Sequence, residues 1–453
     1  MLLRLYIDNF TSFSKDVELN TFPNRGLDKH KNHVYEVAGI SVLKLISIYG
    51  ANASGKSNMI KALSYLKSLV LDEELPDVSY VEKFALASAN LEKPFKIAVE
   101  YISEGIGFIY GVEISDDEIL CEELYKSGLG ISEDELIFRK TIENNSAKIK
   151  FFDSFYESER NEILLSVIEE SLLKKNKPVF KFLTTIKGTN LQDILKAFYW
   201  FDNTLRIIRP KESAFGLPYH LSKDKLLWKF ANNVMKAYHV GIEKLVLEKF
   251  TAEEFFGMDD SSIISELKSN LNKSENEFVT LRSENGNDEI CVVEENNELF
   301  VLQLKIKHYS KDIEEPFNVD NESDGTKRLL DFIPAFYISL KHPAVFCVDE
   351  IGQSIHPILI KKLIEKFSFD DETAGQIIFT THESNLLDQE ILRRDEIWFT
   401  EKEKYGGTSL YSLNSFKEHN TKNIRKGYLN GRYGAIPFLG NLEDLNWHAD
   451  DLI

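Results

Sequence analysis

The residue types that a phosphate-binding site requires stand together early in the chain. Residues 50–57 read Gly-Ala-Asn-Ala-Ser-Gly-Lys-Ser, which is the complete spacing of a phosphate loop. Glycines allow backbone N–H groups to curve around an anion, the lysine ammonium can reach the β- and γ-phosphates of a nucleotide, and the serine hydroxyl can bind Mg²⁺. A chance match, or a loop for another anion, is the alternative, but three further motifs follow in the order that a nucleotide site needs. The expected nucleotide-binding residues are Gly50, Asn52, Ser54, Gly55, Lys56, Ser57 and Asn58.

Two adjacent carboxylates form the second motif. Asp349 and Glu350 directly follow the apolar run 343–348, which is typical of a buried strand. The carboxyl end of a parallel strand is where α/β proteins bind their ligands. We expect Asp349, together with Ser57, to hold Mg²⁺ directly or through water, and Glu350 to act as the general base toward an attacking water. The alternative is a solvated strand end with two surface acids.

The third motif is a polar, glycine-containing turn at 321–328, which opens an apolar-periodic segment that predicts a helix. The Ser323 hydroxyl and the Gly325 backbone N–H can bind a phosphate at the N-terminus of that helix. An ordinary helix cap is the alternative.

The fourth motif is a histidine at the end of another apolar run, 377–381. A single histidine is usually structural, but His382 follows Asp349 by 33 residues, which is one strand–helix unit. We therefore expect its imidazole on the neighbouring strand tip, where it can sense the γ-phosphate.

These motifs need a strand before the loop, a helix after it, and a domain assembled from distant segments. The run 45–49 is short, apolar and β-prone, and Met59, Leu63 and Leu66 share one face of the helix that should follow the loop. Lys56 and Asp349 are 293 residues apart in the sequence. The nucleotide-binding domain is therefore expected to be split by a large insertion.

The intervening sequence predicts strands at 95–114 and 277–308, and helices at 158–173 and 223–248. Neither helical segment sustains the heptad repeat of a coiled coil. We expect an α/β fold with the N-terminal half of the nucleotide-binding domain at 1–150, a compact, mainly helical insert domain at 151–275, the C-terminal half at 276–420 and a tail at 421–453.

Composition and charge indicate a cytoplasmic protein with protein partners. The formal net charge of −19 opposes general attraction to DNA or RNA. Two basic segments, 174–181 and 422–432, are more simply explained as a solvated helix end and as a protein interface, although the second interleaves basic residues with tyrosines. The three dispersed cysteines indicate neither a disulfide framework nor a zinc site. The sequence has no leader-like start and no apolar run long enough to cross a membrane.

The four motifs, in this order, resemble those of the ATP-binding-cassette superfamily. The segments 5–13, 393–399 and 428–437 narrow the resemblance to OLD-, RecF- and SMC-like ATPases, and further to the stand-alone OLD-like AAA ATPases of bacterial abortive-infection and anti-phage loci. The ATPase subunit of PARIS-type systems is the closest named example. The resemblance covers about residues 1–110 and 300–440.

This resemblance implies a P-loop NTPase of the ABC and RecF type that binds and hydrolyses ATP with Mg²⁺, with Lys56, Glu350 and His382 as catalytic residues. In the superfamily, the signature of one subunit completes the nucleotide site of another, so a head-to-tail dimer or larger oligomer is implied. The implied trans signature consists of Ser323, Gly325, Thr326 and Lys327. The anti-phage group further implies a sensor or scaffold that binds a phage trigger protein and a separate effector, such as a Toprim-type nuclease, without strong binding to DNA.

Two departures from the family pattern leave alternatives open. No glutamine precedes Gln192, so the Mg²⁺-contacting glutamine loop is not assigned. No Asp-x-Asp follows His382, so an ATPase without a nuclease domain is implied. The alternatives are a RecF-like DNA-repair ATPase and a structural assembly ATPase with little turnover.

Overall fold

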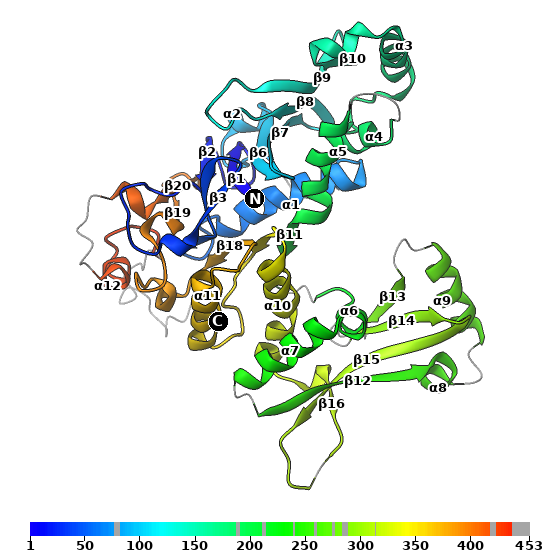
Figure 1. The fold of residues 1–453 in the computed structure, drawn as a ribbon. Helices are drawn as coiled ribbons and strands as arrows, with labels where there is room; N and C mark the ends of the chain where they lie inside the picture. The colour runs from blue at the N-terminus through cyan, green and yellow to red at the C-terminus, as the bar shows by residue number, and fades with distance from the viewer. Residues whose placement is uncertain are drawn as a thin grey trace, which may run out of the picture.

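This computed structural model describes residues 1–76, 82–186, 191–210, 214–238, 241–257, 261–273, 277–282, 289–312, 314–416 and 423–436. The strand that precedes the phosphate loop lies in its central sheet. The sheet has six strands (Figure 1), which are, in spatial order, β11 (Leu205–Ile208), β17 (Val345–Val348), β18 (Gln376–Thr381), β5 (Leu45–Gly50), β19 (Ile397–Lys402) and β20 (Thr408–Ser412). The first five run parallel, and β20 is antiparallel to β19. The prediction that the Asp349 and His382 motifs follow neighbouring strands is confirmed, because β17 pairs with β18.

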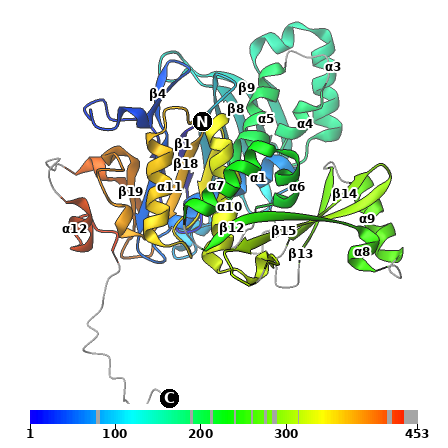
Figure 2. The same ribbon diagram turned by 60° about the horizontal axis from the view of Figure 1, so that its bottom comes forward.

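Helices cover both faces of the central sheet (Figures 1 and 2). The covering helices are α1 (Lys56–Asp72) on one face, and α10 (Asp324–Lys341) and α11 (Pro357–Phe369) on the other. Successive strand residues face opposite sides, so Ile46 and Ile48 of β5 join the core with α1, whereas Leu45 and Tyr49 join the core with α10 and α11. This double coverage explains why the strands read as continuous apolar runs rather than as alternating patterns.

A second sheet, which is antiparallel, contains the first strand of the chain and packs into the same core as α1. Its seven strands are, in spatial order, β10 (Ser146–Phe151), β9 (Glu135–Glu143), β8 (Glu118–Lys126), β7 (Ile106–Ser115), β6 (Phe95–Ser103), β1 (Leu2–Asp8) and β2 (Val17–Asn20). Met59, Leu63 and Leu66, which were predicted to share a helix face, are all buried in this core. The predicted antiparallel strands at 95–114 are confirmed as β6 and β7.

The segment 151–275 does not form the single helical domain that we expected. Its first helices are α3 (Glu159–Val167), α4 (Phe180–Thr184) and α5 (Gln192–Tyr199), which are short. Short helices cannot enclose a core of their own, and this part of the chain packs against the antiparallel sheet instead. The Trp200 ring, for example, stacks on Tyr101 with ring centroids 4.4 Å apart. The chain then enters the central sheet as β11, within the expected insert.

Residues 217–318 form a mixed module that crosses the expected boundary at 275 and shares part of the core of α10. Its helices and strands are α6 (Leu217–Lys223), α7 (Lys225–Ala237), β12 (Ile242–Thr251), α8 (Ala252–Phe256), α9 (Ser261–Lys273), β13 (Phe278–Arg282), β14 (Glu289–Glu295), β15 (Glu298–His308) and β16 (Phe317–Asn318). The second half of the helix predicted at 223–248 is therefore a strand. Local spacing could not reveal it, because β12 pairs with β15, beginning with Ile242 opposite His308. Asn296 and Asn297, which both have positive φ, form the turn between β14 and β15.

Residues 424–436 belong to the core of the central-sheet domain rather than to a tail. The rings of Tyr428, in α12 (Ile424–Leu429), and of Tyr433, just after it, stack on Phe399 of β19, with centroids 5.8 and 5.9 Å away. Both tyrosines are buried and cannot stack on nucleic-acid bases. Lys422 and residues 437–453 lie outside the described part of the chain.

The remaining small elements are β3 (Val34–Val37) and β4 (Ile40–Leu43), which pair with each other, and α2 (Ser88–Leu91). The basic segment 174–181 forms local ion pairs, including Lys175 with Glu118 at 3.0 Å and Lys177 with Glu74 at 3.1 Å. Within the described residues, no helix combines the length and the apolar character needed to cross a membrane.

Candidate nucleotide-binding site

The phosphate loop connects β5 to α1, and two of its glycines allow neighbouring groups to approach closely. Gly55 has a φ of 103°, a left-handed conformation that side chains rarely permit. A Cβ at Gly55 would lie 2.4 Å from Thr408 Oγ1, and a Cβ at Gly50 would lie 2.4 Å from Ser54 Oγ. Glycine is therefore required at both positions for steric reasons. Asn52 lies in the exposed part of the loop.

Hydroxyl groups from other segments brace the loop. Ser54 Oγ and Thr400 Oγ1 are 2.7 Å apart, and Thr408 Oγ1 donates to the Ser54 carbonyl at 2.9 Å. On the other side, Asn58 Nδ2 donates to Ser12 Oγ at 2.7 Å. Ser54 and Asn58 were predicted from the sequence. Their three bracing partners, Thr400, Thr408 and Ser12, were not. Their only signal is an isolated hydroxyl residue near an apolar segment, which is too common to be diagnostic.

The Lys56 ammonium group lies over the loop and close to the two carboxylates. Its Nζ donates to the carbonyl oxygens of Gly50 at 2.8 Å and of Ala51 at 2.9 Å. Burial lowers the pKa of Lys56, while Glu350 and Asp349 act in the opposite direction. The same loop and lysine thus present the positive charge that nucleotide phosphates require.

One hydrogen bond joins the two predicted magnesium ligands. Ser57 Oγ donates to Asp349 Oδ1 at 3.0 Å, although 292 residues separate them in the sequence. Thr380 Oγ1 donates to the same carboxylate oxygen at 2.5 Å. Hydroxyl and carboxylate oxygens are hard ligands of the kind Mg²⁺ prefers, and nucleotide phosphates commonly supply the rest of its coordination. These residues therefore fit a magnesium–nucleotide complex.

Glu350 is held in a strained backbone conformation at the end of β17. Its φ of 52° lies in the left-handed region, which costs a residue with a side chain about 1–3 kcal/mol. The Glu350 N–H donates to Thr380 Oγ1 at 2.8 Å, which helps to keep this conformation. Strain of this kind persists where the surrounding structure enforces it, and it concentrates at functional sites.

A comparison with protein-family models matches residues 45–388 to the family described as "AAA domain, putative AbiEii toxin, Type IV TA system". The match spans well over half of the chain and includes the loop and both carboxylates. This chain belongs to that AAA-domain family.

Solved structures similar to this AAA-domain protein include an SMC head domain from Thermotoga maritima, with 12% identity, a TM-score of 0.37, and coverage of 91% of this chain and 98% of that chain. An SMC head bound to the C-terminal winged-helix domain of ScpA has 12% identity and a TM-score of 0.42, covering 91% of this chain and 97% of that chain. A search of curated proteins found no match.

The predicted trans signature opens α10 of the AAA domain. Ser323 is exposed and caps the helix, accepting a hydrogen bond from the Thr326 N–H at 3.2 Å. Thr326 is buried, and Lys327 Nζ donates to a backbone carbonyl of the preceding turn at 2.9 Å. A Cβ on Gly325 would lie 2.5 Å from the Ser354 carbonyl oxygen. Ser323 is thus the exposed residue among these four, Gly325 lies against the Ser354 backbone, and the action of both in trans stays a prediction.

His382 lies where the sequence placed it, directly after β18, and its side chain is exposed. Because β18 pairs with both β17 and β5, His382 is at the same sheet edge as Glu350 and the loop. Its role as a sensor of the γ-phosphate remains a prediction.

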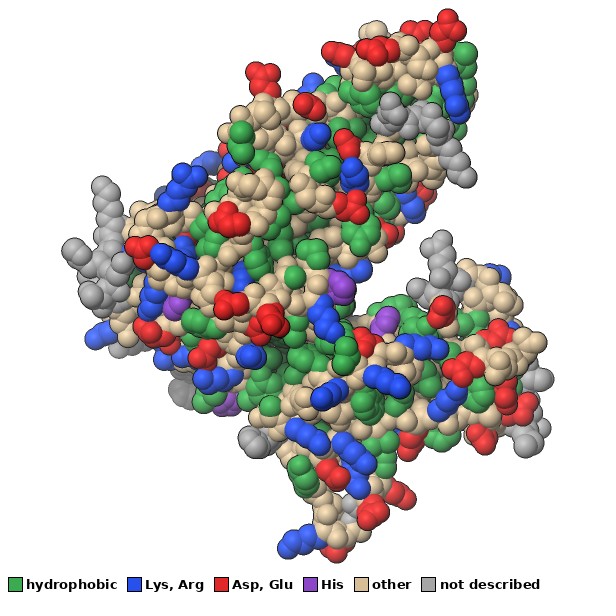
Figure 3. Space-filling view, in the orientation of Figure 1, with side chains coloured by type: hydrophobic (Ala, Val, Ile, Leu, Met, Phe, Trp, Pro, Cys, Tyr) green, Lys and Arg blue, Asp and Glu red, His purple; other side chains and the backbone are tan. Residues whose placement is uncertain are grey.

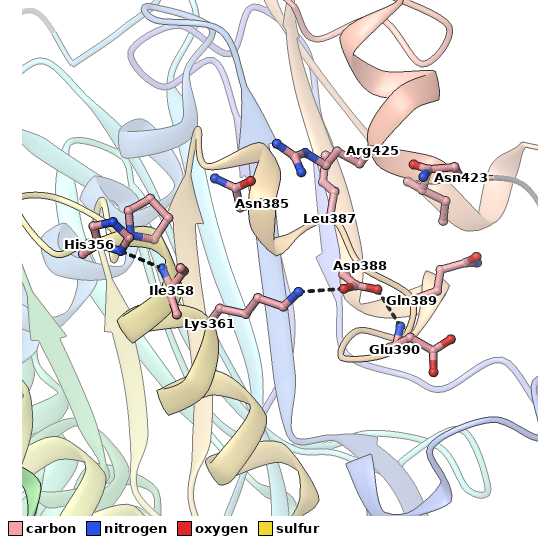
Figure 4. Close-up of a pocket in the computed structure, with 12 residues that line it drawn as sticks. His356, Ile358, Lys361, Asn385, Leu387, Asp388, Gln389, Glu390, Asn423 and Arg425 are labelled. Atoms are coloured by element: carbon pink, nitrogen blue, oxygen red, sulfur yellow. Dashed lines mark hydrogen bonds and ion pairs between the residues drawn. The ribbon is translucent and has the colours of Figure 1, made fainter. Parts of the chain in front are cut away.

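A cavity of about 920 Å³ lies between the start of α11 and α12 (Figure 4). One wall carries His356, from the loop after Glu350, and another carries Asn385, from the turn after His382. Lys361 and Asp388 point toward each other and form an ion pair at 2.7 Å. No phosphate-loop residue lines this cavity, so it is distinct from the nucleotide site.

Proposed function

We propose that this AAA-domain protein binds ATP with Mg²⁺, hydrolyses it, and uses the bound nucleotide as a switch. The observation that carries the proposal is the hydrogen bond between Ser57 Oγ and Asp349 Oδ1 at 3.0 Å. It joins the phosphate loop to the strand that ends in two carboxylates, and a nucleotide-hydrolysing site needs both parts together. Membership in an AAA-domain family supports ATP as the ligand.

Each residue of the site has its own role in this proposal. Lys56 and the loop N–H groups bind the phosphates, and Ser57 and Asp349 hold Mg²⁺, which neutralises phosphate charge. Glu350 accepts the proton of the attacking water as general base. His382 contacts the γ-phosphate from the neighbouring strand.

The fuller proposal is a sensor and scaffold of anti-phage defence, similar to the PARIS-type ATPase subunit. ATP joins copies head to tail through Ser323 and Gly325, and hydrolysis releases them, so that a separate effector such as a Toprim-type nuclease is held or freed when a phage protein binds. The family description, which names AbiEii and a type IV toxin–antitoxin system, supports a role in abortive infection. The strands β12–β15, with α8 and α9, project away from the central sheet (Figure 1), and they offer a surface for such partners.

Two variants test the ATP site. Lys56→Ala should lose ATP binding in calorimetry, whereas Lys31→Ala, which changes an exposed lysine, should retain it. Glu350→Gln should bind ATP but hydrolyse it on the order of 10²-fold more slowly, because the amide keeps the shape and loses the basicity. Equal affinities of the wild type and Lys56→Ala would reject the site, and undiminished turnover in Glu350→Gln would reject the base.

The scaffold role is tested with the products of neighbouring genes. A nuclease that copurifies with Glu350→Gln in ATP, and dissociates from the wild type as ATP is hydrolysed, is the expected result. Protection of cells against phage by this chain alone would contradict the need for a separate effector.

One observation favours a second candidate, a RecF-like DNA-repair ATPase. Lys225, Lys229 and Lys236 lie on the exposed face of α7, a helix without acidic residues. Among the residues that the structure describes, none forms an ion pair with these three lysines. Figure 3 shows Lys and Arg side chains gathered over α7 and β12. Such a stripe can contact a phosphate backbone, although the net charge of −19 opposes DNA binding.

A further inference from the structure

Thr380 is a buried residue of β18 whose contacts converge on the two catalytic carboxylate residues. Its side chain is 0% exposed. The Thr380 hydroxyl donates to Asp349 Oδ1 at 2.5 Å and accepts from the Glu350 N–H at 2.8 Å. The Thr380 carbonyl accepts from the Ile351 N–H at 3.1 Å. One residue of β18 therefore contacts three consecutive residues at the end of β17.

The direction of the two hydroxyl bonds follows from the groups involved. A backbone N–H can only donate, so the Thr380 oxygen must act as acceptor toward Glu350. An ionised carboxylate can only accept, so the single hydroxyl hydrogen of Thr380 points to Asp349. Hydrogen bonds to a charged carboxylate are stronger than those between neutral groups, which makes this contact suited to orienting the carboxylate.

This arrangement determines which carboxylate oxygen of Asp349 is available to bind a cation. Oδ1 receives the hydroxyls of both Thr380 and Ser57. Across the described ranges of the chain, no hydrogen-bond donor contacts Oδ2. Oδ2 is thus the oxygen that can bind a cation. The Glu350 backbone, meanwhile, has a left-handed φ of 52°, and its N–H is held by the Thr380 hydroxyl.

We propose that Thr380 is a positioning residue for ATP hydrolysis, which orients the Asp349 carboxylate toward Mg²⁺ and holds Glu350 in place as the general base. This inference rests on the proposed function of the site. Thr380 acts through Asp349 and Glu350, so its removal should affect the response to Mg²⁺ and the turnover number more than the affinity for ATP.

The test compares three variants of the full chain. Thr380→Val removes the hydroxyl and keeps the branched shape, while Thr380→Ser keeps the hydroxyl. Thr21→Val is the matched control, because Thr21 is equally buried and its hydroxyl donates to the Leu2 carbonyl at 2.8 Å in a different part of the protein. ATP affinity with and without Mg²⁺, kcat, KM and the Mg²⁺ concentration for half-maximal activity are measured together with melting temperature.

We expect Thr380→Val to lower kcat and to raise the half-maximal Mg²⁺ concentration, each by about 10- to 100-fold, which is the usual effect of losing a partner that orients a metal ligand. Thr380→Ser should restore both values, and Thr21→Val should lower only the melting temperature. If Thr380→Val resembles Thr21→Val while Glu350→Gln loses turnover, Thr380 has no positioning role and the ATPase proposal stands. A wild type without Mg²⁺-dependent ATP binding would overturn both.

Discussion

The guanidinium group of Arg328 lies 3.5 Å from the backbone carbonyl oxygen of Asp349. Arg328 belongs to α10, the helix that begins with the signature, and Asp349 follows β17. The same side chain donates to the carbonyl of Arg209 at 2.9 Å, just beyond β11. A shift of α10 when a partner binds Ser323 would therefore disturb the strand ends that carry Asp349 and Glu350, the carboxylates proposed to act in hydrolysis.

Alanine should be tolerated less well at Gly55 than at Gly39, although both glycines have left-handed φ values, 103° and 81°. A Cβ at Gly39 meets no atom within 4 Å. Gly39→Ala should therefore lower the free energy of unfolding only by the cost of a left-handed backbone for alanine, about 1–2 kcal/mol. A Cβ at Gly55 would lie 2.4 Å from Thr408 Oγ1, so Gly55→Ala should lose more stability and also weaken ATP binding. Urea unfolding and calorimetry measure both effects. Equal losses in the two variants would show that the loop can move away from Thr408.

The Asp331 carboxyl group should make stability depend on pH. Burial raises the pKa of Asp331 from 3.8 to about 6, although the Ala214 N–H and Arg328 act in the opposite direction. Because the folded protein holds this proton more tightly than the unfolded chain, the contribution of Asp331 to stability is full below about pH 4 and is lost as the pH rises through about 6.

Asp331→Asn therefore should match the wild type near pH 4 and be more stable above pH 7. The difference should reach up to about 3 kcal/mol, which corresponds to a shift of about two pKa units. The asparagine carbonyl can still accept the hydrogen bond from the Ala214 N–H, so this contact is the same in both proteins. Denaturant unfolding of both proteins from pH 4 to pH 8 measures the difference. A stability gap that widens toward acid pH would contradict the assignment.

Assembly in trans can be tested by mixing two inactive chains. Lys56→Ala removes the lysine proposed to bind phosphate. Ser323→Asp keeps a good helix cap and, if the signature acts in trans, places a negative charge opposite a partner's phosphate. The two variants together can form one site with both wild-type halves, so partial ATPase activity should return.

Ser323→Asn is the control for the added charge, because it also replaces the hydroxyl and caps the helix but stays neutral, and it should lose less activity than Ser323→Asp. Aspartate at Gly325 is less suitable, since a Cβ there would already lie 2.5 Å from the Ser354 carbonyl oxygen. Absence of recovery, in a mixture shown to exchange subunits, would indicate a site completed within one chain.

Binding to DNA should be weak. At about 150 mM salt, we expect a Kd for duplex or single strands no tighter than about 10⁻⁴–10⁻⁶ M, because the net charge of −19 opposes binding. Lys229→Glu combined with Lys236→Glu tests the α7 stripe, and Lys268→Glu on α9 of the same module is the control. Nanomolar binding that only the α7 variant abolishes would favour the RecF-like function.

The sequence by itself determined the parts of this protein that depend on residues close together along the chain. The phosphate loop between β5 and α1, the strands β17 and β18, and the helix that starts after Ser323 were all predicted, because the apolar run, the glycine spacing and the cap are local patterns. The order of the motifs also predicted that β17 and β18 are neighbours, since one strand–helix unit separates them.

The tertiary structure decided the parts that depend on pairing between distant segments. The strand β12 replaced the second half of a predicted helix, because its partner β15 lies far along the chain. Thr400 and Thr408 became supports of the loop only because β19 pairs with β5, and β20 with β19. Thr380 lies beside Asp349 because Val348 of β17 is opposite Phe379 of β18, and a shift of one residue in that register would turn the Thr380 hydroxyl to the other face of the sheet. No local pattern in the sequence specifies that register, because it is set by the packing of both faces of the sheet at once.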